Sequence, residues 1–307
     1  MLFRLLLISF LIATGTSYSQ FMTKNSWKKQ RKEIFLGFGI TNFLGDLGGK
    51  NQIGTHYSYA DLNLALTRPS ATFGMRYRLD PNWAIRGDIN YMRLTGNDAL
   101  TQEKFRHNRN LSFRTNVFEL SANVEYAFFR GKSGNRYGFK NTFMRRYKSK
   151  NHYLYVSGGV GVFWFNPKAE YQGIWYALQP LGTEGEGLPG GPKKYKRVSV
   201  SIPMAIGYRM GLGRKFTLGI EYNFRKTFTD YIDDCSGNYY DNAAILMARG
   251  PLAAHFADPS LGLIPGQTAA GQQRGNPKDK DSYMSLEVKL GMFIKEKRRK
   301  KLTRSKF

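Results

Sequence analysis

The sequence predicts an all-β protein, an eight-stranded antiparallel transmembrane β-barrel with long extracellular loops and basic periplasmic extensions. The segment NVFELSANVEYAFF, residues 116–129, is apolar at every second position, and Glu119 and Glu125 are among the polar residues between. A period of two places the two sets on opposite faces of a β-strand. One continuously apolar face and one polar face over about ten residues is what a strand of a membrane barrel requires.

Seven further segments alternate in the same way. They are residues 34–41, 71–79, 83–91, 154–164, 198–208, 216–225 and 284–294. Aromatic residues make up 15% of the chain, with 19 Tyr and 22 Phe, a composition that favours β-structure with aromatic girdles. Together with residues 116–129 these segments give an even number of strands, which up-and-down pairing closes into a small barrel without free edges.

The polar faces of the predicted strands carry many charges. They include Arg76, Arg78, Arg86, Asp88, Glu119, Glu125, Glu221, Arg225, Glu287 and Lys289. Eight strands enclose only enough room for side chains to interlock. We therefore expect ion pairs that plug the lumen, with basic partners for Glu119 and Glu125 on the neighbouring strands, because unpaired charges in so narrow a space would be costly. A selective pore or proton path is the alternative.

The first residues predict export. Residues 1–19 contain Arg4, the apolar run LLLISFLIATG, and small residues at Ser17 and Ser19, as in a signal peptide cleaved after Ser19. A transmembrane anchor is the alternative, but the apolar run is short for a membrane span. Cys235 is the only cysteine of the chain, so no intrachain disulfide can form.

Connection lengths predict the orientation of the barrel, residues 33–294, in the cell outer membrane. The connections after the second and sixth strands are short, whereas those after the first, third, fifth and seventh are long, the last covering 226–281. Bacterial barrels keep short turns in the periplasm and long loops outside, so both termini are expected to be periplasmic. The insertion 130–151 breaks this pattern, because it is long although it follows the fourth strand.

The positive charge of the chain, +25 in total, is concentrated in segments assigned to the periplasm. These are a lead at 20–32, the insertion 130–151 and a tail at 295–307. The electric field of this concentrated positive charge would attract an acidic periplasmic protein as a partner. Nucleic acid is a less suitable partner, because the signal peptide predicts that the chain is exported. The predicted partner-binding residues are Arg136, Lys140, Arg145, Arg146, Lys148, Lys297, Arg298, Arg299, Lys300 and Lys301. Solvated ends, or contact with anionic inner-leaflet headgroups, are the simpler interpretation.

The loops offer two candidates for chemistry. Asp230, Asp233, Asp234 and Asp241 lie in the oxygen-rich segment TDYIDDCSGNYYD, which could hold calcium, although turns use the same residues and the spacing is not that of an EF-hand. His107, with Asp98 and Ser112 in the same loop, is the best candidate for a lipid-modifying barrel enzyme. Neither pattern is specific, so we expect no enzymatic activity, no cofactor and no metal.

Two further loop segments predict local structure. Residues 166–196 contain Tyr171, Trp175 and Tyr176, which predict a self-packed lid, and residues 242–256 predict one or two short helices.

Several segments resemble the PorG-type outer-membrane barrels of the Bacteroidota type IX secretion system. The resemblance is carried by RNLSFRTNVFELSANVEY (109–126), FNPKAEYQGIWYALQPLGTEGEG (165–187), TDYIDDCSGNYYD (229–241), GQQRGN (271–276) and NFLGDLGG (42–49). It implies a non-enzymatic component of the protein-secretion and gliding-motility machinery. In that family the barrel is associated with a periplasmic ring of a lipoprotein and a second periplasmic protein. A stand-alone structural or adhesive barrel is the alternative.

Overall fold

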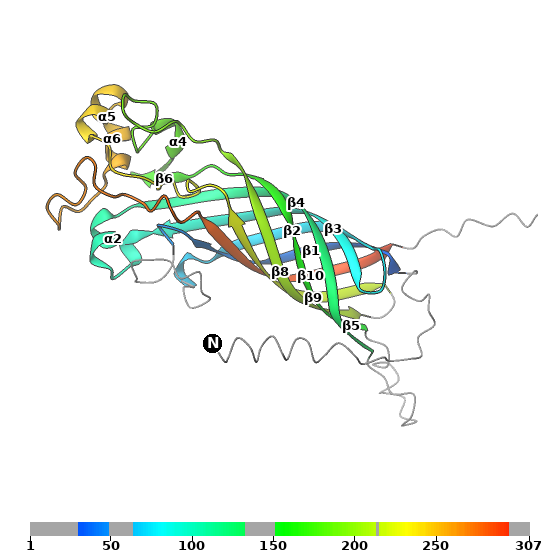
Figure 1. Cartoon of the computed structure of the whole chain (residues 1–307). Coiled ribbons are helices and arrows are strands. Elements are labelled where there is room, and N and C mark those ends of the chain that lie inside the picture. Colours follow the sequence, from blue (N-terminus) through cyan, green and yellow to red (C-terminus); the bar gives the residue numbers. More distant parts are fainter. Residues whose placement is uncertain (1–29, 49–63, 133–150, 213–214, 295–307) are drawn as a thin grey trace, which may run out of the picture.

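Eight long antiparallel strands form the body of the molecule (Figure 1). The computed structural model describes residues 30–48, 64–132, 151–212 and 215–294. The long strands are β1 (Lys32–Leu44), β2 (Arg68–Arg78), β3 (Trp83–Asn97), β4 (Ser112–Lys132), β5 (Asn151–Trp164), β8 (Val198–Leu212), β9 (Phe216–Thr227) and β10 (Ser282–Ile294). Each overlaps one of the predicted segments, so the strand prediction is confirmed.

The eight strands close into a barrel. Each pairs with its neighbours along the chain, β1 pairs with β10, and no barrel strand is left with an open edge. Lys32 lies opposite Ile294, so the chain enters and leaves the barrel at the same end. The connection between β4 and β5 also lies at this end, because Lys132 pairs with Asn151. We call it the terminal end, and the opposite one the loop end.

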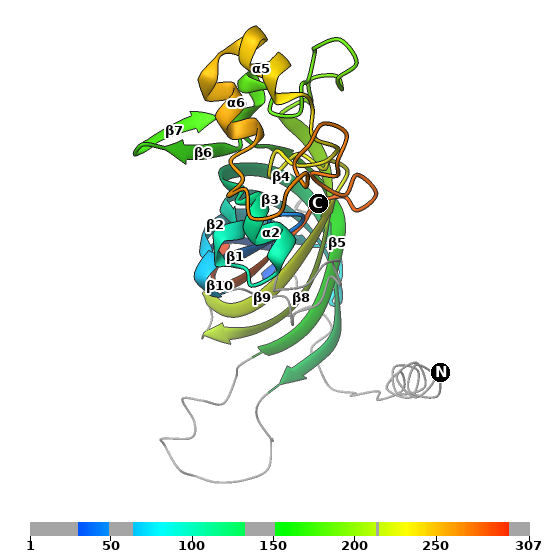
Figure 2. The same ribbon diagram turned by 90° about the vertical axis from the view of Figure 1, so that its left-hand side faces the viewer.

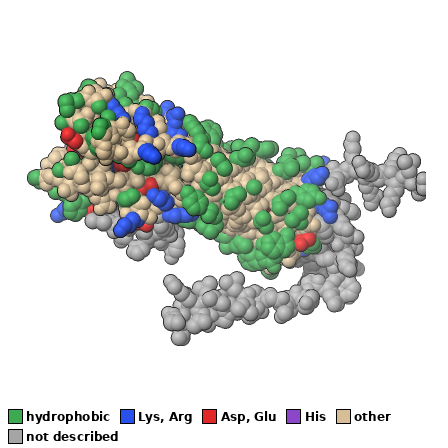
Figure 3. Space-filling view, turned by 45° about the horizontal axis from the view of Figure 1, so that its top comes forward, with side chains coloured by type: hydrophobic (Ala, Val, Ile, Leu, Met, Phe, Trp, Pro, Cys, Tyr) green, Lys and Arg blue, Asp and Glu red, His purple; other side chains and the backbone are tan. Residues whose placement is uncertain are grey.

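The outer wall of the barrel is apolar. Phe38 and Leu120 are 66% and 65% exposed, and hydrophobic side chains form a belt around the part of the molecule nearer the terminal end (Figure 3). Aromatic pairs border this belt: the rings of Trp83 and Tyr126 lie 4.6 Å apart, and at the other border Phe118 lies 5.2 Å from Tyr91. A barrel with an apolar belt between aromatic girdles spans a membrane, as the outer-membrane β-barrels do.

Strand β4 is longer than the alternating segment that predicts it. A β-bulge between Ala127 and Phe129 shifts its register against β5. An extra residue in one strand breaks the period of two, so Phe128 and Phe129, 47% and 56% exposed, both point outward.

The connections at the loop end fold into a structure that we call the loop cap (Figure 2). Its elements are η3 (Leu64–Leu66), η4 (Asp98–Leu100), α2 (Lys104–Arg109), β6 (Lys168–Tyr171), β7 (Ile174–Ala177), α4 (Leu178–Leu181), α5 (Asn242–Arg249) and α6 (Pro251–Ala257). The helices α5 and α6 confirm the prediction for residues 242–256. Among the residues that the structure describes, no helix is both long and apolar enough to cross a membrane.

The β6–β7 hairpin was not predicted. Gln172 and Gly173, with φ of 51° and 80°, form its two-residue turn. This turn type usually has Asn or Asp before the glycine, so Gln-Gly is a poor signal for it. The hairpin packs on the cap, since the Tyr171 and Tyr176 rings lie 6.2 and 5.9 Å from that of Phe256. The prediction that residues 166–196 pack on themselves therefore holds only in part, because α6 supplies the partner.

Candidate functional site

Buried ion pairs fill the barrel lumen. Arg76 bridges two carboxylates, with Nη1 2.9 Å from an oxygen of Glu33 and Nε 2.7 Å from an oxygen of Glu125. Arg86 Nη1 lies 2.5 Å from Glu221. The side chains of these five residues are at most 2% exposed. The predicted plug of ion pairs is therefore present, and it leaves the lumen filled by side chains.

A second part of this lumen network lies nearer the loop end. Glu119 accepts hydrogen bonds from Arg225 Nε and from the Tyr283 hydroxyl, each at 2.9 Å. Lys289 donates to Glu221 at 2.6 Å and lies 3.5 Å from Glu287. Each carboxylate thus has a cationic partner, which offsets the cost of burying it.

The prediction of partners on neighbouring strands is wrong for Glu119 and only partly right for Glu125. Arg225, which binds Glu119, comes from β9, whereas the neighbours of β4 are β3 and β5. Arg86 of the neighbouring β3 does reach Glu125, but only at 4.0 Å, whereas Arg76 of β2 lies at 2.7 Å. Closure of the barrel brings distant strands face to face, and this cannot be read from alternation.

Two members of the network were missed from the sequence. Glu33 comes just before the first predicted strand segment, 34–41, and is not among the charges predicted for the lumen, yet it is 1% exposed inside the barrel. Arg209 of β8 is buried and lies 3.1 Å from Glu125. The signal for both was present: each adjoins an outward residue, Ile34 and Tyr208, so a period of two places it inward.

Arg78 is the exception among the predicted lumen charges. It is 3% exposed and donates to the Tyr153 hydroxyl at 3.1 Å, but within the described part of the chain it forms no salt bridge. Its guanidinium stacks on the Tyr153 ring, 4.6 Å from the centroid. This end of the lumen therefore carries a buried positive charge without a carboxylate in contact.

Two buried arginines hold the loop cap together, beginning with Arg109. Its Nε donates to Asp98 at 2.7 Å, and its two terminal nitrogens donate to the backbone carbonyls of Arg274 and Asp46 at 2.5 and 2.9 Å. These contacts join three loops that lie far apart in the sequence. Arg109 belongs to one of the segments that carry the family resemblance.

Arg274 is the second of these arginines, and it is 3% exposed. Its Nη1 donates to Glu184 at 3.1 Å and to the carbonyl of Asp234 at 2.6 Å. Its Nη2 lies 3.5 Å from the carbonyl of Phe256. Arg274 thus connects the loop before β8 with two parts of the loop between β9 and β10.

The structure brings three of the four predicted calcium ligands into one buried loop. Asp230, Asp233 and Asp234 are each at most 2% exposed, whereas Asp241 is exposed and caps α5 by accepting from Ala243. The buried carboxylates accept hydrogen bonds from the protein: Ser236 donates to Asp230, Leu47 and Cys235 to Asp233, and Thr183 and Tyr195 to Asp234. In the described ranges no three His, Cys, Asp or Glu side chains are arranged to hold a metal ion. Calcium binding stays the alternative to the turn structure that we expect for this segment.

Burial of these acidic groups shifts their ionisation. Burial raises the pKa of Asp230 to about 7, and the nearby Asp46 carboxylate raises it further. Burial also raises the pKa of Asp234 to about 7, with a contribution from Glu186. The loop cap therefore holds carboxyl groups that are partly protonated at neutral pH.

We expect the loop cap to open more readily as the pH rises. Asp230 and Asp234 keep their protons up to about pH 7 in the closed cap, whereas in an opened loop they lose them near pH 3.9. The closed state then binds more protons, so these groups stabilise it below about pH 4 and lose this effect between about pH 4 and 7. Limited proteolysis of the cap at pH 5 and pH 8, normalised to an unstructured peptide, measures the effect. Asp230→Asn should flatten the pH dependence, and an unchanged slope would contradict this assignment.

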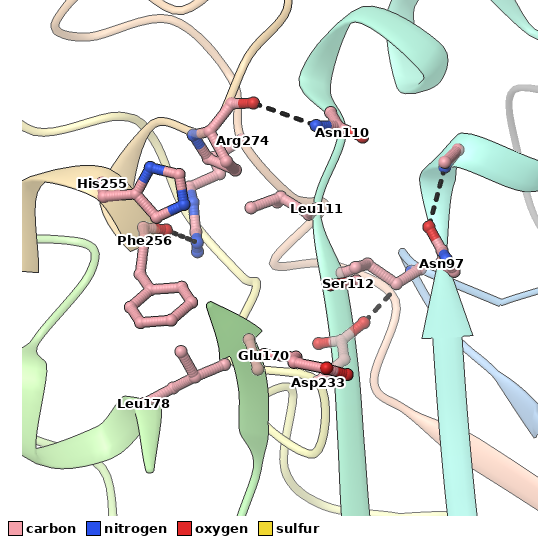
Figure 4. A pocket seen from close by; sticks show the side chains of 14 residues that line it. Asn97, Asn110, Leu111, Ser112, Glu170, Leu178, Asp233, His255, Phe256 and Arg274 are labelled. Carbon is pink, nitrogen blue, oxygen red and sulfur yellow. Dashed lines mark hydrogen bonds between the residues drawn. The ribbon is translucent and has the colours of Figure 1, made fainter. Parts of the chain in front are cut away.

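A cavity of about 230 Å³ lies under the cap, between the start of β4, the hairpin and α6 (Figure 4). Its wall combines polar side chains with Leu111, Leu178 and Phe256. The polar members are Asn97, Asn110, Ser112, Glu170, Asp233, His255 and Arg274. Asn110 and Arg274 donate to backbone carbonyls, so much of this polar lining is engaged in holding the cap together.

Comparison with known proteins places the chain in a family. A family model described as "Domain of unknown function (DUF6089)" matches residues 16–172, which is half of the chain. The chain belongs to this family. No curated protein matches the chain in sequence.

Solved structures similar to the chain include a surface protein and an outer membrane protein. Neisserial surface protein A matches with a TM-score of 0.38 and 8% identity over 86% of this chain and 97% of that chain. Ail, the attachment invasion locus protein of Yersinia pestis, matches with 0.34, 10% identity and coverages of 87% and 99%. OprG from Pseudomonas aeruginosa matches with 0.34, 9% identity and coverages of 87% and 98%.

No hydrogen bond joins the three candidate catalytic residues Asp98, His107 and Ser112, all of which lie in the described part of the chain. Both oxygens of Asp98 accept from arginines, Oδ2 from Arg109 at 2.7 Å and Oδ1 from Arg106 at 3.2 Å. His107 lies in the last turn of α2, and Ser112 begins β4. Asp98 therefore fixes α2 to the cap, and nothing in its contacts prepares it to orient a histidine.

The predicted signal peptide and most of the segments predicted to bind a partner lie outside the described residues. This holds for the signal peptide 1–19, for most of the lead 20–32 and the insertion 130–151, and for the tail 295–307. All ten predicted partner-binding residues, Arg136, Lys140, Arg145, Arg146, Lys148, Lys297, Arg298, Arg299, Lys300 and Lys301, belong to them. They stay predictions.

Proposed function

We propose that this barrel is a non-enzymatic component of the type IX secretion and gliding machinery, and that it anchors a periplasmic ring to the outer membrane. The observation that carries the proposal is the filled lumen. Arg76, Arg86 and Arg225 are each at most 3% exposed and bound to carboxylates from other strands. A barrel filled in this way serves as an anchor rather than as a channel, and this agrees with the role implied by the PorG-type resemblance.

The terminal end is the face that we assign to the ring. The lead, the insertion and the tail all attach there, next to Lys32, Lys132 and Ile294. With both termini in the periplasm, their positive charge faces an acidic partner and speeds its association. The partner in this proposal is the ring of a lipoprotein and its associated periplasmic protein.

Removing the basic residues should release the ring without preventing membrane insertion. We expect deletion of residues 295–307, or replacement of Arg145 and Arg146 by glutamine, to reduce co-purification of periplasmic proteins at least about 10-fold, because several charge contacts are lost. The measurement is a pull-down after mild detergent extraction. Lys278→Gln, which removes one exposed charge from the loop end, is the control.

The outcome separates this proposal from its alternative. Undiminished capture of the same partners by the deletion variant would refute docking through the basic face. Absence of any stoichiometric periplasmic partner from the unmodified protein would favour a stand-alone barrel. A specific observation supports that second candidate: the cap exposes apolar side chains, with Met247 82% and Leu263 63% exposed, as an adhesive surface requires.

A further inference from the structure

Three cations meet on the outer wall near the loop end. Arg93 lies on β3, Arg114 on β4 and Lys168 on β6, and Arg114 pairs directly with Lys168 in the sheet. Their sequence neighbours Met92, Phe113 and Ala169 are 0%, 2% and 3% exposed, so alternation turns the cations outward. Figure 3 shows Lys and Arg side chains gathered beyond the apolar belt, in the loop half of the molecule. We call Arg93, Arg114 and Lys168 the outer cation cluster.

The cluster lies at the level of lipid headgroups. Tyr91 and Phe118 belong to the aromatic girdle nearer the loop end. Arg93 is two residues beyond Tyr91 and Arg114 four residues beyond Phe118 on the same outward faces, which is about 7 and 14 Å along tilted strands. Headgroups extend about 5 to 8 Å beyond the hydrocarbon on each side of a bilayer, and arginine side chains are long enough to reach them.

The positive charge of the cluster is not neutralised by the protein. In the described part of the chain none of the three cations forms a salt bridge, and Arg93 Nε is buried without a hydrogen-bond partner. Arg93 and Arg114 are close enough to repel each other, and Glu170 is the carboxylate that acts on Arg114. Three cations and one carboxylate leave an excess of two positive charges.

Arg114 is held in place for a planar contact. Its guanidinium lies over the Trp175 ring, 3.6 Å from the centroid. Stacking fixes the plane of the guanidinium and leaves its N–H edges free. Two parallel N–H groups on such an edge match two oxygens of a phosphate.

We propose that the outer cation cluster binds the phosphate monoester of an anionic lipid in the leaflet that the loop end faces. A phosphate monoester carries a charge of about −1.5 to −2 at pH 7, which matches the excess of the cluster. A phosphodiester lipid carries only one negative charge, and its phosphate has two oxygens free instead of three. The site is separate from the basic terminal end, so it does not depend on the proposed docking of a ring.

Native mass spectrometry of the full-length protein in detergent tests the proposal. The probes are phosphatidic acid, a phosphate monoester, phosphatidylglycerol, a diester, and phosphatidylcholine, which has no net charge. We expect one phosphatidic acid to bind at least about 10-fold more tightly than phosphatidylglycerol, and Arg114→Gln or Lys168→Gln to remove about 10-fold of that affinity. Arg114→Lys should restore only part of it, because an ammonium lacks the two-point contact.

The controls test whether a loss of binding comes only from a lower net charge or from misfolding of the variant. Lys278→Gln at the loop end and Lys215→Gln at the terminal end remove one charge each outside the cluster and should bind phosphatidic acid normally. Circular dichroism confirms that each variant is folded. Equal affinity for the monoester and the diester, or full binding by the Arg114→Gln and Lys168→Gln double variant, would overturn the proposal. So would displacement of the lipid by millimolar inorganic phosphate, which would make the site one for free anions.

Discussion

Replacement of Arg76 by methionine is expected to destabilise the barrel by about 3–5 kcal/mol, since removing one partner of a buried ion pair leaves an uncompensated buried charge. Arg76 is the hub of the lumen network, with Glu33 and Glu125 both within 2.9 Å of its guanidinium. The substitution leaves these two carboxylates facing each other, with Arg209 still close to both and Arg86 4.0 Å from Glu125. Unfolding by urea in lipid vesicles, followed by tryptophan fluorescence, measures the change.

Arg78→Met is the matched control, because Arg78 is equally buried but forms no salt bridge within the described residues. Its removal relieves repulsion with Arg209, and it loses one hydrogen bond to Tyr153 and some attraction to Glu33, so we expect a change within about 1 kcal/mol. Equal destabilisation by the two substitutions would show that burial of the side chains, and not ion pairing, stabilises the lumen.

Replacement of Arg274 by methionine is expected to open the loop cap while the barrel stays folded. The substitution removes the charged hydrogen bonds to Glu184 and to the Asp234 carbonyl and leaves both acceptors buried. We expect the free energy of cap opening to fall by about 3 kcal/mol. If the protease cuts only the open cap, and the cap opens and closes faster than it is cut, cleavage becomes roughly 100-fold faster. Limited proteolysis with identification of the cut sites measures it, and the cuts should fall in the loop between β9 and β10.

Lys104→Met controls for the loss of a positive charge at the loop end, because Lys104 is exposed on α2. It should leave the cleavage rate unchanged. If the Arg274 variant also lost its folded barrel, the expectation that the cap opens independently of the barrel wall would be wrong. An unchanged cleavage rate would show that Arg274 does not hold the cap closed.

The wall of the barrel could be predicted because alternation is a local property. Each strand has to present an apolar face to lipid and a polar face to the lumen, so a period of two is written into every strand. The inward position of Arg76, Arg86 and Glu221 follows from this period alone. The same rule, applied one residue further, would have placed Glu33 and Arg209 inside as well.

The partners of those charges could not be predicted. Glu119 lies on β4 and Arg225 on β9, and only the tilt, stagger and closure of the eight strands bring them within 2.9 Å. The loop cap has the same origin. Arg109 and Arg274 lie 165 residues apart, and their hydrogen bond depends on where the barrel places the ends of β3, β4, β9 and β10.

Alternation within single strands is thus enough to predict a membrane barrel with eight strands, charged inside and apolar outside, because each of these properties repeats along one strand. The tertiary structure decided which charges pair, how the loops close over the barrel, and that Arg93, Arg114 and Lys168 meet on the outer wall. These features join residues from different strands, and barrel closure sets the distances between them.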